Sequence, residues 1–234
     1  DHTDVDDVDG WYRANPALGI RISEEFVGDE LRSLEADVDE FRRERLGIPD
    51  PLPSFDADPP KLDPDQWAAT VTDTPPDIAP GACVLAYDVH NNTSAICIAT
   101  GTLSASFVEV TDHRSGDGWL PGRLVELVQR WRPVAVGMDS GNGPAAAILG
   151  PIREAFEEAG LDPELVKSLT SREYRDACGG FFEAVSNRTV RRPRVSPDNL
   201  EPAGAQCPER VVGDAFVWDR RRAPVPVSSL VAAT

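Results

Sequence analysis

Two aspartates stand in places where the sequence otherwise predicts buried strands. Asp88 lies near the end of the apolar run 82–90, and Asp139 directly follows the run 134–138. Aspartate is disfavoured in strands, and a carboxylate at the rim of a buried sheet is costly to desolvate unless a positive group pairs with it. Carboxylate oxygens are ligands that Mg²⁺ and Mn²⁺ prefer, so the two residues predict a divalent-metal site. The nearby His90 is expected to be a bystander.

This interpretation requires the two strands to be neighbours, because a lone aspartate at a strand end is more often a helix cap or turn former. Residues 120–131 carry Leu124, Leu127 and Val128 at helical spacing between the two runs. A right-handed crossover through this helix would make the strands parallel neighbours, about 4.8 Å apart. Their carboxylates could then bridge two cations about 3.5–4 Å apart, an arrangement that suits phosphodiester hydrolysis.

The order of the predicted elements defines the fold class. Three closely spaced strands predict an antiparallel meander, and alternating helices and strands follow it. These elements cover residues 82–90, 94–102, 105–111, 120–131, 134–138, 144–159, 165–169 and 171–185, the last helix beginning at a Ser171 cap. The order predicts an α/β fold of the ribonuclease H-like type, with a three-stranded meander plus parallel strands in one mixed sheet flanked by helices. Another mixed α/β sheet is the alternative.

The N-terminal third has a different character. Residues 23–46 alternate apolar and charged positions as amphipathic helices do, and residues 47–80 are rich in proline and aspartate. We therefore expect a helical and then extended linker segment over residues 1–78 and a globular domain over residues 79–234. The small residues 140–143 after Asp139 precede a predicted helix, and backbone there could approach a phosphate.

The charge balance limits how the chain could hold nucleic acid. There are 40 acidic and 23 basic residues, giving a formal charge of −17, so bulk attraction to DNA is excluded and any contact must be local. Two basic clusters could supply such contacts, although solvated surface arginines would look the same. The clusters comprise Arg188, Arg191, Arg192 and Arg194, and then Arg220, Arg221 and Arg222.

Other bulk features indicate a cytoplasmic protein. No apolar run approaches the roughly 18 residues of a membrane span, and the first residues are acidic, unlike a secretory signal. The four cysteines form no CxxC pair, so buried free thiols are expected rather than a zinc site or a disulfide framework.

The sequence resembles the C-terminal half of large terminase subunits, particularly those of actinobacterial phages and prophages. The resemblance covers nearly the whole chain, and its segments occur in the order found in that family. The matching segments are WYRANPALG at 11–19, FRRERLG at 41–47, AYD at 86–88, VGMD at 136–139, ACGGF at 177–181, GDAFVW at 213–218 and LVAAT at 230–234.

The resemblance implies a nuclease coupled to an ATP-driven packaging motor, cutting concatemeric double-stranded phage DNA in the cytoplasm of the infected bacterium. It implies that Asp88 and Asp139 are catalytic metal ligands. The partners it implies are DNA, the portal protein, the small terminase subunit and the ATPase motor domain of the same protein. No GxxxxGK[ST] phosphate loop occurs in this sequence, so residues 79–234 are expected to be the nuclease domain alone.

The sequence departs from the family pattern at one position. Relatives often carry an aspartate just before the last helix, where this chain has Pro226. A third catalytic metal ligand must then come from elsewhere, with Asp214 the first candidate and Asp219 the second, or a second ion binds weakly. Two alternatives to the packaging nuclease stay open. One is a ribonuclease H-like junction resolvase, and the other is a catalytically weak assembly module that docks on the portal or small terminase.

Overall fold

The computed structural model describes residues 7–15, 17–33, 59–102, 104–139, 144–194 and 200–234, in two compact units, Asp1–Asp56 and Ala57–Thr234. The first unit contains helices α1 (Val8–Ala14) and α2 (Glu24–Ser33), and Trp11, Leu18 and Val27 form its small core. Helix α2 confirms the beginning of the amphipathic segment. The rest of that segment, to residue 46, lies outside the described residues.

The second unit is built on a seven-stranded mixed sheet with the strand order β1-β7-β4-β3-β2-β5-β6. Strands β2, β3 and β4 form an antiparallel meander, and every other pairing in this sheet is parallel. The predicted ribonuclease H-like sheet is therefore confirmed. Its strands are β1 (Val71–Thr72), β2 (Cys83–His90), β3 (Thr93–Thr102), β4 (Ala105–Ser115), β5 (Val136–Asp139), β6 (Val166–Leu169) and β7 (Val190–Pro193).

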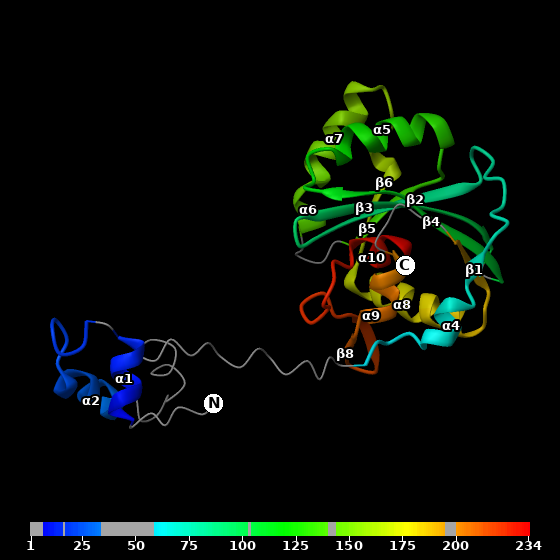
Figure 1. Ribbon diagram of the computed structural model, residues 1–234. Coiled ribbons are helices and arrows are strands. Elements are labelled where there is room, and N and C mark those ends of the chain that lie inside the picture. The colour runs from blue at the N-terminus through cyan, green and yellow to red at the C-terminus, as the bar shows by residue number, and fades with distance from the viewer. Residues whose placement is uncertain (1–6, 16, 34–58, 103, 140–143, 195–199) are drawn as a thin grey trace. The chain divides into compact units, whose positions relative to one another are not determined.

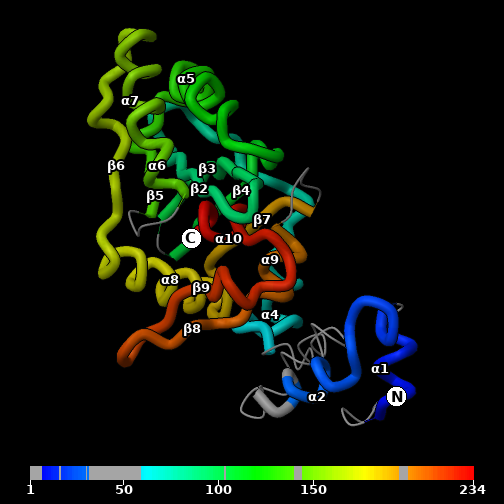
Figure 2. Tube along the Cα trace, turned by 90° about the vertical axis from the view of Figure 1, so that its left-hand side faces the viewer, coloured from blue at the N-terminus to red at the C-terminus, as the bar shows by residue number. Residues whose placement is uncertain are grey.

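Helices cover both faces of the sheet (Figure 1), and each face has its own hydrophobic core. On one face, α5 (Leu120–Trp131), α6 (Pro144–Ala147) and α7 (Leu149–Glu158) pack over β2 through residues such as Leu85 and Tyr87. On the other, α4 (Pro64–Ala68), α8 (Ser171–Ser186), α9 (Leu200–Gln206) and α10 (Ser228–Ala233) pack over β3 and β4. The turned view shows the same two layers (Figure 2).

Local sequence signals explain most of these elements. Helix α5 turns Leu120, Leu124 and Leu127 inward at the predicted helical spacing. The predicted helix 144–159 is divided into α6 and α7, and a 3₁₀ turn (Pro163–Leu165) leads into β6. Helix α8 is capped by Thr170 rather than by Ser171, because Thr170 and Glu173 form a reciprocal capping box.

The boundary expected at residue 79 lies within the second unit. Leu62 and Trp67 are buried in the core of this unit, and β1 pairs in parallel with β7 at the sheet edge. The aspartate- and proline-rich composition concealed this packing, because Asp63 and Pro64 are not loop residues but the cap and first position of α4. Residues 59–78 therefore belong to the globular unit and not to a linker.

The cysteines and the helix lengths agree with the composition of the chain. All four cysteines are buried free thiols, as predicted. Among the described helices, none combines the length and the hydrophobicity needed to cross a membrane.

Candidate active site

Strands β2 and β5 bring Asp88 and Asp139 to the same edge of the sheet. The two strands are parallel neighbours with Leu85 opposite Val136 and Ala86 opposite Gly137. If this register is extended by two residues, Asp88 lies opposite Asp139 at the carboxyl ends of the strands. The juxtaposition that the sequence predicted is therefore present.

A third side chain joins the two carboxylates. Arg220 follows strand β9 (Ala215–Trp218), and its Nη1 donates to both carboxylate oxygens of Asp88, at 2.8 and 3.0 Å. Its Nη2 donates to Oδ2 of Asp139 at 3.1 Å. The Asp88 side chain is 0% exposed, that of Asp139 12% and that of Arg220 20%. One guanidinium thus bridges two buried or nearly buried acids.

The electrostatics follow from this burial. Burial raises the pKa of Asp88 to about 7, while the charge and hydrogen bonds of Arg220 lower it and the charge of Asp139 raises it further. Burial alone would lower the pKa of Arg220, but the neighbouring acids, Asp88 foremost, raise it above its usual range. The Arg220 guanidinium also lies 5.9 Å from the centre of the Tyr174 ring on α8. The negative charges of Asp88 and Asp139 are therefore poorly solvated, and a cation beside them, here the Arg220 guanidinium, is needed to balance them.

The segment after β9 presents Arg220 through a side-chain-capped turn. Oδ1 of Asp219 accepts the backbone N–H groups of Arg221 and Arg222 at 3.0 and 3.1 Å, and its Oδ2 accepts Nε of Arg222 at 3.1 Å. These bonds occupy Asp219, the second candidate for a third metal ligand, as a turn former.

His90 also positions this segment. Its Nδ1 accepts the backbone N–H of Val227 at 3.1 Å, which ties the end of β2 to the start of α10. Burial lowers the pKa of His90, so the neutral ring required for this acceptor role is favoured. A backbone hydrogen bond between His90 and Arg220 opposes that decrease. Sequence reasoning treated His90 as a bystander, whereas it connects the strand that carries Asp88 to the C-terminal segment.

The structure does not bring Asp214 to the pair. Asp214 is exposed in the tight turn between β8 (Glu209–Val212) and β9. Within the described ranges, no group of three His, Cys, Asp or Glu side chains is placed to hold one metal ion. The expected trio of Asp88, Asp139 and Asp214 is therefore not assembled. The Gly213-Asp214 pair is explained by the hairpin turn, where Gly213 has φ +64°.

The predicted DNA-contacting arginines have different environments. Arg188, Arg191, Arg194 and Arg221 are exposed. Nη1 of Arg191 donates to the Ala69 carbonyl at 2.7 Å, and Arg194 pairs with Asp73 on the surface. Arg192 is buried, is paired with Glu201 and lies 4.0 Å from the centre of the Trp67 ring, so it is a core residue rather than a DNA contact. The guanidinium of Arg220 is directed at the two acids, and its side chain is only 20% exposed.

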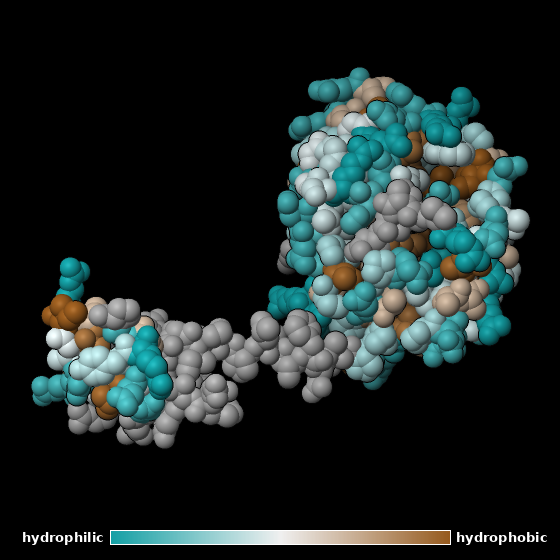
Figure 3. Space-filling view, viewed as in Figure 1, coloured by the Kyte–Doolittle hydropathy of each residue, from teal (hydrophilic) through white to brown (hydrophobic). Residues whose placement is uncertain are grey.

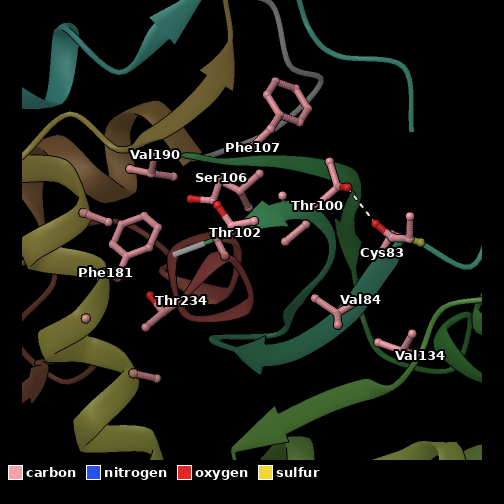
Figure 4. A pocket seen from close by; sticks show the side chains of 18 of the residues that line it. Cys83, Val84, Thr100, Thr102, Ser106, Phe107, Val134, Phe181, Val190 and Thr234 are labelled. Carbon is pink, nitrogen blue, oxygen red and sulfur yellow. Dashed lines mark hydrogen bonds between the residues drawn. The ribbon is translucent and has the colours of Figure 1, made fainter. Parts of the chain in front are cut away.

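Among the coloured residues on the side visible in Figure 3, hydrophilic residues predominate and hydrophobic ones form scattered groups. A separate pocket of about 920 Å³ lies at the beginning of β2 and the end of β3, away from Asp88. Its lining includes Val84, Thr100, Phe181 and Val190 (Figure 4). This pocket is mostly apolar and contributes nothing to the carboxylate site.

Comparison of the whole chain with solved structures identifies the fold. The HK97 bacteriophage large terminase matches 99% of this chain with a TM-score of 0.58 and 15% sequence identity. The fold is that of phage large terminase nucleases. The large terminase nuclease from thermophilic phage G20c with bound magnesium matches 76% of this chain and 95% of its own, with a TM-score of 0.52 and 10% identity. The likeness noted in the sequence is thus confirmed at the level of fold.

The chain corresponds to only part of the large terminases that it matches. The D6E phage large terminase in complex with ADP matches 91% of this chain, with a TM-score of 0.50 and 11% identity. This chain spans 53% of the HK97 terminase and 50% of the D6E terminase, about half the length of each. No protein-family model and no curated protein matches the sequence.

Proposed function

We propose that this chain is a metal-dependent endonuclease that hydrolyses phosphodiester bonds of double-stranded DNA at Asp88 and Asp139. The observation that carries the proposal is the pair of carboxylates held level at the ends of two neighbouring parallel strands around one positive group. Two acids so placed repel each other and are poorly solvated, which favours a cation between them. A purely structural ion pair would need only one of the two acids.

The donor set suits a hard divalent ion. Asp88 and Asp139 offer carboxylate oxygens, and Asp139 is partly exposed, so solvent could complete the coordination of Mg²⁺ or Mn²⁺. When bound, such an ion lowers the pKa of an attacking water and neutralises charge on the scissile phosphate. A second ion would require oxygens beyond these two carboxylates, and substrate phosphate is a suitable source.

The protein's own residues would position the reactants. Asp88 is immobilised by burial, and its backbone lies in the central part of the sheet between β3 and β5. Four exposed arginines are proposed to contact DNA phosphates: Arg188, Arg191, Arg194 and Arg221. For Arg191 and Arg194 this contact requires that they release their present partners, the Ala69 carbonyl and Asp73. Because the chain as a whole is acidic, such contacts must be local.

The likeness to large terminases supports a proposal for the biological setting. We propose that the nuclease cuts concatemeric phage DNA during genome packaging in the cytoplasm of the infected bacterium. Its proposed partners are the ATPase motor domain of the same protein, the portal and the small terminase subunit. This chain spans about half of each of two large terminase structures, one of them in complex with ADP, and this supports the proposed link to an ATPase motor domain.

The test is plasmid nicking in Mg²⁺ or Mn²⁺ at low salt. Asp88→Asn and Asp139→Asn should each reduce the nicking rate by at least about a hundredfold, because each removes a ligand charge from the metal site. The matched control is Asp214→Asn, an equivalent change at the exposed hairpin turn, which should nick at close to the rate of the unmodified chain. Circular dichroism of each variant checks that it is folded.

Full activity in Asp88→Asn and Asp139→Asn would contradict the proposal. A four-way DNA junction offered beside linear duplex separates the two nuclease hypotheses. Cleavage of duplex supports the packaging nuclease, whereas strong preference for the junction would indicate a resolvase.

A further inference from the structure

Arg220 occupies the position that a metal ion would need. Its guanidinium donates to both oxygens of Asp88 and to one oxygen of Asp139, with all three contacts between 2.8 and 3.1 Å. A divalent ion held by these carboxylates must approach the same oxygens. Of these three side chains, that of Asp88 is fully buried, whereas those of Asp139 and Arg220 are partly exposed, so an ion would approach from the side of Asp139 and Arg220.

The contact connects two distant parts of the chain. Arg220 is 132 residues from Asp88 and 81 from Asp139, and it lies outside the strands that carry the acids. It stands in the Asp219-capped turn after β9, with the start of α10 anchored to His90 a few residues later. Withdrawal of the guanidinium from the pair would therefore require movement of the Arg220 side chain or its turn, and not of the strands that carry the acids.

The net charge of the site differs between the state in which Arg220 contacts the acids and the state in which a divalent ion does. When both acids are ionised, the two carboxylates and one guanidinium carry a net charge of −1, while the same carboxylates with a divalent ion are neutral. If both cations faced the acids at contact distance they would repel each other strongly in this poorly solvated place. Contact with the ion and the full set of Arg220 hydrogen bonds are therefore mutually exclusive.

We propose that Arg220 is a displaceable internal counter-ion, which competes with the catalytic metal for Asp88 and Asp139 and so lowers the metal affinity of the free protein. This inference rests on the proposed function, since it assumes that the two acids bind metal. Arg220 stabilises the pair when no ion is bound, and metal binding requires that these hydrogen bonds be broken.

The experiment is calorimetric titration of the whole chain with Mn²⁺ in the absence of DNA. Arg220→Gln removes the charge and keeps hydrogen-bonding capacity, so it should bind Mn²⁺ at least about tenfold more tightly than the unmodified protein. Arg220→Lys keeps the charge and should bind less tightly than Arg220→Gln. The matched control is Arg172→Ala, which deletes one charge from an arginine whose side chain is 85% exposed on α8 and should leave Mn²⁺ affinity within about twofold.

Thermal unfolding with and without Mn²⁺ tests the same proposal if a variant is too unstable for calorimetric titration. Without metal, Arg220→Gln should unfold at a lower temperature than the unmodified chain, because Asp88 and Asp139 have lost the positive charge of the guanidinium. Saturating Mn²⁺ should raise its unfolding temperature by more than it raises that of the unmodified chain.

The outcomes separate the two claims. Equal or weaker Mn²⁺ binding by Arg220→Gln, with clear binding by the unmodified chain, would overturn the counter-ion role and leave the metal site intact. If the unmodified chain, Arg220→Gln and Arg220→Lys all fail to bind Mn²⁺ and gain no thermal stability from it, the proposed metal-dependent function itself is wrong.

Discussion

At the scale of single residues, Asp88 is the most constrained group in the candidate site. It is fully buried, and it shares Arg220 with Asp139. Burial raises its pKa to about 7, so its ionisation is incomplete near neutral pH. A carboxyl group must lose its proton before it can bind a metal, and the proton therefore competes with the ion at Asp88.

This competition predicts a pH dependence of metal binding. Below pH 7 Asp88 is mainly protonated, so Mn²⁺ affinity should rise as the pH increases through about 7 and level off above about 8. Since Arg220 lowers the pKa of Asp88, the rise should move to higher pH in Arg220→Gln. Calorimetric titrations at several pH values measure both effects, and an affinity that stays constant from about pH 6 to about pH 8 contradicts the prediction.

The residue scale also shows how far sequence reasoning could reach. Asp88 and Asp139 were predictable as neighbours, because a polar residue at the end of an apolar run and a right-handed crossover are local signals. The role of Arg220 was not predictable, since it depends on a contact across 132 residues and the sequence shows only three adjacent arginines. Asp214 was misassigned because a hairpin turn selects the same residue type as a metal site does.

At the scale of elements, helix α8 illustrates a cap that the sequence placed one residue too late. Thr170 Oγ1 accepts the backbone N–H of Glu173 at 3.3 Å, and the Glu173 carboxylate accepts the Thr170 N–H at 2.8 Å. The Thr170 backbone N–H and the Thr170 hydroxyl both donate to the Glu173 carboxylate at 2.8 Å, and these two bonds lower the pKa of Glu173, the backbone bond contributing most. The helix they begin carries Tyr174, whose ring faces Arg220, so the cap fixes one wall of the site.

Thr170→Ala should therefore lower the free energy of unfolding by about 1 kcal/mol, because a capping hydrogen bond to α8 is lost. Ser171→Ala, one residue further along, makes a matched control and should change it by less than about 0.5 kcal/mol. Urea denaturation followed by circular dichroism measures the difference. A larger loss in Ser171→Ala than in Thr170→Ala would restore the cap that the sequence suggested.

Elements beyond the predicted core were harder to recognise. The meander and the crossover helices have strong periodicity, and their boundaries were found within a few residues. Strands β1 and β7 have only two and four residues and make their pairings at the sheet edge, where a short sequence carries little signal. Helix α4 is hidden in an aspartate- and proline-rich stretch, and only the large apolar side chain of Trp67 marks it as part of a core.

At the scale of the whole molecule, the structure changes where the globular unit is expected to begin. Trp67 is covered on one side by Arg192 and contacts the Phe181 ring at a centroid distance of 6.3 Å. Its indole N–H donates to the Glu201 carbonyl at 3.2 Å. An isolated unit that starts after this segment would leave Arg192 beside an empty space in the core.

Fragments with different starting points test this boundary. A fragment of residues 57–234 should unfold cooperatively at nearly the temperature of the full chain. A fragment of residues 79–234 should be much less stable, because loss of the Trp67 side chain alone costs about 3–5 kcal/mol. Thermal unfolding by circular dichroism measures both, and equal unfolding temperatures would mean that residues 57–78 are dispensable.

The long separation between Arg220 and its two partners has a consequence for synthesis on the ribosome. The strands bearing Asp88 and Asp139 are complete 81 residues before Arg220 is translated. Until that arginine emerges, the rim of the nascent sheet carries two acids without their compensating charge, and water must remain around them. The final closure of this rim therefore waits for the C-terminal segment, and a chain released before residue 220 would keep its acidic edge hydrated and open.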